Sequence, residues 1–99
     1  MSGVFDFAGK TALVAAASKG LGRAVALELA KGGANVAIFS RDAEAARAAA
    51  EEIAGETGAK VLGLGADVTS AEDLKRCVER TVAEFGGLDH LTWVVTAYL

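Results

Sequence analysis

Short apolar runs and longer amphipathic segments alternate along the chain. The apolar runs have the length of buried strands and cover residues 11–16, 35–39, 60–65 and 88–96. The segments between them have the length of helices, place apolar residues three and four positions apart, and cover 20–31, 43–54 and 71–85. The run NVAIF is apolar without alternation, which is typical of a parallel strand covered on both faces. The pattern predicts the order β-α-β-α-β-α-β.

Polar residues and glycines mark the ends of the predicted helices. Asp42 can cap the second helix, and Gly55 is expected to end it. Two capping boxes fit the start of the third helix, Thr69 with Glu72 or Ser70 with Asp73.

Strands that alternate with helices of this length imply right-handed crossovers and a parallel sheet. We therefore expect an α/β fold of the Rossmann-like, doubly wound class, with the strands in the order 3-2-1-4. This chain would form half of such a fold. A ligand crevice then lies at the carboxyl ends of the strands, where the first and fourth strands diverge.

A small-residue turn joins the first strand to the first helix in KTALVAAASKGLGR, residues 10–23. Gly20 and Gly22 let a bulky anion approach the backbone closely. The N–H groups of the first helical turn have no intrahelical partner, and the helix dipole favours negative charge there. The turn is a candidate phosphate site. Because Gly-x-Gly is common by chance, an ordinary strand-to-helix turn is the alternative.

Composition narrows the classes of function. The 99 residues suit one domain, 53% of them are hydrophobic, and the net charge is -3. With no basic run, binding to nucleic acid or to an anionic membrane surface is not expected. No apolar run approaches the roughly 20 residues of a membrane helix. One Cys and one His exclude an intrachain disulfide and a closed Cys/His zinc site. We expect a cytoplasmic protein.

Four stretches of the chain occur together in one known family. They are GKTALVAAASKGLGRAVA, the SRD after the second strand, the ADVT after the third, and the GGLD before the fourth. Over nearly all of its 99 residues the chain resembles the N-terminal, cofactor-binding half of short-chain dehydrogenases/reductases similar to 3-oxoacyl-acyl-carrier-protein reductases. The resemblance implies one dinucleotide-binding (Rossmann) domain over residues 1–99, incomplete relative to the family.

The family's glycine motif, Thr-Gly-x-x-x-Gly-x-Gly, is matched in part. The matching residues are Ser18, Lys19, Gly20, Leu21 and Gly22. Ala15 and Ala16 stand in place of the Thr and the first Gly. The methyl group of Ala16 costs about 1 kcal/mol if its φ is positive. We expect the cofactor loop, Ala16 included, to bind more weakly but still to bind.

The end of the second strand determines which nicotinamide cofactor the resemblance implies. An NAD site has a carboxylate there for the ribose 2′-OH, whereas an NADP site has a cation for the 2′-phosphate. This chain has Ser40 followed by Arg41, and Lys19 resembles the family's second basic position. Asp42 is expected to point away because it caps a helix. NADP is therefore expected rather than NAD, and the alternative is that both cations are solvated surface residues.

Asp67 and Val68 match the family's Asp-Val pair beside the adenine ring. By that resemblance, the Asp67 carboxylate accepts a hydrogen bond from the exocyclic amine. The alternative is that Asp67 is a turn residue before the third helix.

No catalytic residue is expected in these 99 residues. The family's catalytic Ser and Tyr-x-x-x-Lys have no counterpart, since Tyr98 has no Lys four positions on. Nothing in the spacing makes His90 a base, and Cys77 lies on an apolar helix face. Where the family has Asn-Asn-Ala-Gly, this chain has Trp93, Val94, Val95 and Thr96.

The resemblance implies an enzyme that, when complete, transfers a hydride between NADP(H) and a carbonyl or alcohol of a small-molecule substrate. These residues are expected to be inactive alone. Two alternatives remain, a truncated homologue that binds nucleotide without catalysis and a structural or interaction module. The bare, apolar far edge of the fourth strand also predicts self-association.

Overall fold

The computed structural model describes residues 8–15, 20–67, 69–86 and 92–96. Its strands are β1 (Thr11–Ala15), β2 (Asn35–Ser40), β3 (Val61–Gly65) and β4 (Thr92–Thr96). Its helices are α1 (Gly20–Lys31), α2 (Ala43–Thr57) and α3 (Ala71–Phe85). The strands pair in parallel in the order β3-β2-β1-β4. The expected Rossmann-like α/β fold with a parallel sheet is confirmed.

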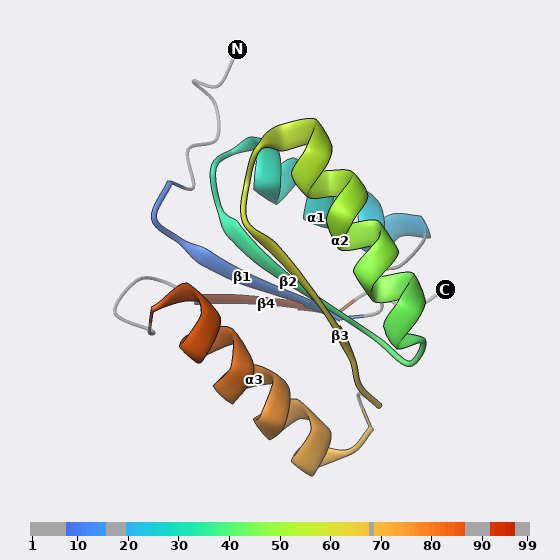
Figure 1. The fold of residues 1–99 in the computed structure, drawn as a ribbon. Helices are drawn as coiled ribbons and strands as arrows, with labels where there is room; N and C mark the ends of the chain where they lie inside the picture. The colour runs from blue at the N-terminus through green and yellow to red at the C-terminus, as the bar shows by residue number, and fades with distance from the viewer. Residues whose placement is uncertain (1–7, 16–19, 68, 87–91, 97–99) are drawn as a thin grey trace.

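Helices cover both faces of the sheet, with α1 and α2 on one face and α3 on the other (Figure 1). On the first face the core is built from small alanines of both helices and from Val14, Val36 and Ile38 of the strands. On the second face Leu13 and Phe39 pack with Cys77 of α3. β1 and β2 are buried on both faces, which explains why they read as continuous apolar runs in the sequence.

α2 packs closely on β3 because both surfaces are small at the contact. Ala46, Ala49, Ala50 and Ile53 of the helix are buried. A Cβ atom added at Gly63 would collide with the carbonyl oxygen of Ala46, and one added at Gly65 would lie 2.6 Å from the Cβ of Ala43. The helix backbone therefore rests directly on this strand.

The expectation that α2 ends at Gly55 is wrong. The helix continues to Thr57, and Gly58 adopts the left-handed conformation at φ 76° and donates its N–H to the Ala54 carbonyl. A glycine inside a helix costs only about 1 kcal/mol, and a second glycine three residues on supplies the left-handed residue that ends helices. Two glycines in the sequence could therefore end this helix, and the later one, Gly58, does so.

Ser70 caps α3, since its side chain accepts from the N–H of Asp73 at 3.3 Å. Of the two capping pairs considered, the Thr69–Glu72 pair is therefore wrong. The expected strand extensions at residues 16 and 88–91 lie outside the described residues.

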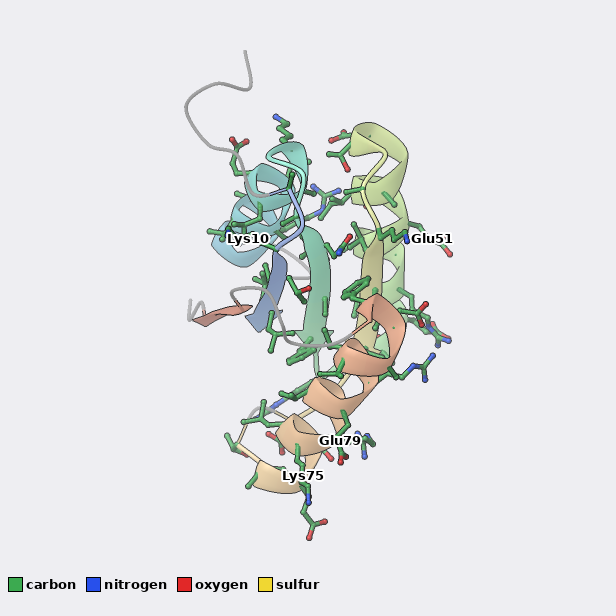
Figure 2. The ribbon with its side chains drawn as sticks, turned by 90° about the vertical axis from the view of Figure 1, so that its left-hand side faces the viewer. Lys10, Glu51, Lys75 and Glu79 are labelled. Atoms are coloured by element: carbon green, nitrogen blue, oxygen red, sulfur yellow. The ribbon has the colours of Figure 1, made fainter. Side chains whose placement is uncertain are left out.

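Charged residues extend from the outer surfaces of the helices. Figure 2 shows Glu51 on α2 and Lys75 and Glu79 on α3, and all three side chains are exposed. None of the helices in the described part of the chain has the length and apolar character needed to cross a membrane.

Candidate functional site

The ends of β2 and β3 lie side by side at the carboxyl edge of the sheet. Ser40 is in register with Gly65, and the N–H of Ala66 donates to the Ser40 carbonyl oxygen at 2.8 Å. The residues that follow, Arg41 and Asp67, therefore leave the sheet at the same place. Ligands bind at this edge in open parallel sheets.

Arg41 and Asp67 form an ion pair across these two strand ends. The distance from Arg41 Nη2 to Asp67 Oδ1 is 3.9 Å, and the two side chains are 78% and 47% exposed. A pair this exposed is weak, contributing about 0–1 kcal/mol. Its significance lies in geometry, because a cation and a hydrogen-bond acceptor are presented together at the edge where a ligand would bind.

The carboxylate of Asp67 is fixed by a local turn. Its Oδ1 accepts from the backbone N–H of Thr69 at 2.9 Å and from the Thr69 hydroxyl at 2.6 Å. These two hydrogen bonds hold the pKa of the Asp67 carboxyl below its ordinary value, and the charge of Arg41 lowers it further. The backbone N–H of Asp67 donates to Asp73 Oδ2 at 2.8 Å, which ties the turn to α3. Asp67 is therefore an ionised acceptor with a restricted orientation.

Asp42 is the carboxylate nearest in sequence to the end of β2, and its side chain caps the N-terminus of α2. Its Oδ1 accepts from the N–H groups of Glu44 and Ala45, each at 3.1 Å. Its own N–H donates to the hydroxyl of the buried Ser40 at 3.3 Å. As expected, Asp42 caps a helix, so the charge carried outward at the end of β2 is that of Arg41.

The N-terminus of α1 lies at the same edge. β1 lies between β2 and β4, and its Ala15 is in register with Phe39, one residue before Ser40. α1 begins at Gly20, and its first turn holds no acidic residue. The positive end of this helix dipole is therefore not offset by a carboxylate of its own first turn.

Residues 10–97 match the short chain dehydrogenase family. The chain belongs to that family. It is 41% identical over 83 residues to a 3-oxoacyl-[acyl-carrier-protein] reductase of Staphylococcus aureus, a match that covers 83% of this chain and 33% of the relative. It is also 41% identical over 85 residues to a hydroxynaphthalene reductase-like protein of Metarhizium anisopliae, and this match covers 85% of this chain and 32% of the relative.

Solved structures of the same family superpose well. A short-chain type dehydrogenase/reductase from Mycobacterium marinum is 41% identical with a TM-score of 0.77, over 84% of this chain and 32% of that one. L-Sorbose reductase from Gluconobacter frateurii, complexed with NADPH and L-sorbose, is 31% identical with a TM-score of 0.79, with the same coverage. The chain thus spans about a third of the length of these relatives.

The site residues expected from the family resemblance fall into three groups. Ser40, Arg41 and Asp67 are brought together at the ends of β2 and β3. Residues 20–22, Gly-Leu-Gly, form the first turn of α1. The others lie outside the described residues, and these are Ala16, Ser18, Lys19 and Val68. Their roles stay predictions.

Two residue pairs that support the site were not singled out from the sequence. Thr69 orients Asp67, and the Asp-x-Thr spacing is the signal that predicts such a turn. Arg23 of α1 binds Glu52 of α2 at 3.1 Å, which links the helix behind the glycine turn to its neighbour. Nothing in local sequence connects two residues on different helices, so this second pair required the fold.

Proposed function

We propose that this chain binds the adenosine and phosphate end of NADP in a short-chain oxidoreductase. The observation that carries the proposal is the pairing of Arg41 with Asp67 at the carboxyl edge, beside the N-terminus of α1. L-Sorbose reductase complexed with NADPH and an archaeal alcohol dehydrogenase complexed with 5-hydroxy-NADP, both 31% identical to this chain, support the cofactor class. We further propose that β3-β2-β1-β4 is half of a doubly wound sheet and that residues 1–99 are its dinucleotide-binding part.

Each element has a distinct role in this proposal. Arg41, with Ser40 beside it, binds the 2′-phosphate through its fork of N–H donors. Asp67 and Val68 contact the adenine. The pyrophosphate lies against the first turn of α1 and its preceding loop, contributed by Ala16, Ser18, Lys19, Gly20, Leu21 and Gly22.

The nicotinamide, when bound, supplies the hydride chemistry. In the whole oxidoreductase, the reaction would be hydride transfer between NADP(H) and a carbonyl or alcohol of a small-molecule substrate. The described residues bind and orient the cofactor and hold no group assigned to proton transfer.

Calorimetric titration with NADP and, in parallel, with NAD tests the proposal. We expect NADP to bind more tightly, and Arg41→Asp to weaken NADP by about tenfold or more while leaving NAD within a fewfold. Arg47→Asp is the control, because Arg47 is exposed on α2 and the change in charge is the same. Equal weakening of both nucleotides, or no preference for NADP, would contradict the assignment of Arg41.

A module with no nucleotide site is the second candidate. Ala15 and Ala16 replace the Thr and Gly of the family motif, and Trp93 and Val94 stand where it has asparagines. If the chain unfolds cooperatively but neither nucleotide gives heat, this candidate replaces the first.

A further inference from the structure

Oδ1 of Asp67 faces both Thr69 and Arg41. It accepts both hydrogen bonds from Thr69, and it is the oxygen that lies 3.9 Å from Arg41 Nη2. The two short hydrogen bonds fix the position of the carboxylate. Arg41 is the less constrained partner, because its side chain is 78% exposed and its 3.9 Å separation from Asp67 is longer than a hydrogen bond. In this arrangement the Arg41 guanidinium lies toward a negative charge that is held in place.

A 2′-phosphate bound to Arg41 would compete with that charge. The guanidinium can face the phosphate in a two-pronged arrangement only by giving up part of its attraction to Asp67. The phosphate would also lie near the Asp67 carboxylate, and like charges repel. Both effects oppose NADP, and neither acts on NAD, which has no 2′-phosphate.

We propose that Asp67 is a specificity-determining residue that limits the preference for NADP over NAD by competing with the 2′-phosphate for Arg41. The inference rests on the proposed NADP site and adds a residue outside the end of β2 to the choice of cofactor. Contacts between Asp67 and adenine are common to both nucleotides. They cancel in the ratio of the two dissociation constants, whereas the competition for Arg41 does not.

The experiment measures the Kd of NADP and of NAD for the full chain by calorimetry at low salt. We expect Asp67→Asn to raise the preference for NADP by about two- to fivefold, the size of a weak surface ion pair. Glu56→Gln is the control, since it removes the same charge from an exposed position near the far end of α2. Should Asp67→Asn fail to unfold cooperatively, Asp67→Ala carries the same expectation for the ratio.

A double-mutant cycle separates competition for Arg41 from simple repulsion. In an Arg41→Ala background, the effect of Asp67→Asn on the ratio should shrink markedly, because the shared cation is gone. A ratio that falls or stays constant in Asp67→Asn would overturn the inference, as would an equal rise in both backgrounds or in Glu56→Gln. If the unmodified chain binds neither nucleotide, the proposed function itself fails, and this outcome is visible before any variant is made.

Discussion

Asp67 combines two interpretations that the sequence left as alternatives. It is a turn residue, since its Oδ1 accepts both hydrogen bonds from Thr69. It also stands at the carboxyl edge of the sheet, where the resemblance expects an acceptor for adenine. The two roles are compatible because a carboxylate has two oxygens and about four acceptor positions. The turn that holds Asp67 therefore also orients its carboxylate for the proposed contact with adenine.

Thr69→Val should reduce stability in a way that depends on pH. Losing the hydroxyl donor lets the pKa of Asp67 rise toward its ordinary value, because the Thr69 side-chain hydrogen bond is the largest cause of the lowered pKa. A lowered folded-state pKa contributes stability above the unfolded value of about 3.9, and that stability is lost as the pH falls through the folded value. The difference between variant and parent in urea unfolding should be largest above about pH 5 and shrink toward pH 3.

Thr57→Val is the matched control for that measurement. The Thr57 hydroxyl donates to the Ile53 carbonyl and accepts from the N–H of Ala59, so no carboxylate is involved. The loss in free energy of unfolding caused by Thr57→Val should not change with pH. The same pH dependence in both variants would contradict the link between Thr69 and Asp67.

The Cys77 thiol should react very slowly with alkylating reagents in the folded chain. It is buried against Leu13 and Phe39, and this burial raises the pKa of its thiol. Because the thiolate is the reactive form, alkylation should proceed only through opening of the core, on the order of a hundredfold more slowly than in urea. The rate of iodoacetamide labelling at pH 8, followed by mass spectrometry, measures this. Equal rates with and without urea would show that the α3 face of the sheet is open.

Elements were predicted more reliably than their ends. The alternation of apolar runs and amphipathic segments was sufficient to predict the helices and the parallel sheet. A strand that is buried on both faces consists of consecutive apolar residues, and such a run can be recognised in the sequence. The end of α2 could not be predicted, because Gly55 and Gly58 are both residues that commonly end helices and only Gly58 adopts a positive φ. The Arg41–Asp67 pair was also beyond local sequence, although each residue was assigned to the site separately.

Two glycines associated with α2 should respond oppositely to alanine. Gly63→Ala places a Cβ against the carbonyl oxygen of Ala46, so it should destabilise the fold by about 1–3 kcal/mol. Gly55→Ala is the control, because nothing lies within 4 Å of its added Cβ and the residue is inside the helix. It should stabilise the chain by about 0.5–1 kcal/mol. Thermal unfolding measures both, and similar shifts in Tm would contradict the close packing of α2 on β3.

The two edges of the sheet differ in how they could meet another chain. At β3, the edge lies beneath α2, whose backbone rests on Gly63 and Gly65. Neighbouring strands are about 4.8 Å apart, whereas packed helices need 8–10 Å. Two copies joined through β3 would therefore bring their α2 helices into collision. This helix protects the β3 edge in the manner of covered edge strands.

No such protection is evident at β4 among the described residues, where β1 pairs with one side of the strand and no described strand pairs with the other. We therefore expect the 99-residue chain to associate through β4. Light scattering should give an average mass that rises above the 10.0 kDa of the monomer as concentration increases. Arg47→Glu, on the β3 side, should not change this rise, whereas Val95→Lys should suppress it because a charge on an edge strand opposes pairing. A constant monomer mass at high concentration would contradict the prediction, and a rise that responds only to Arg47→Glu would move the interface to β3.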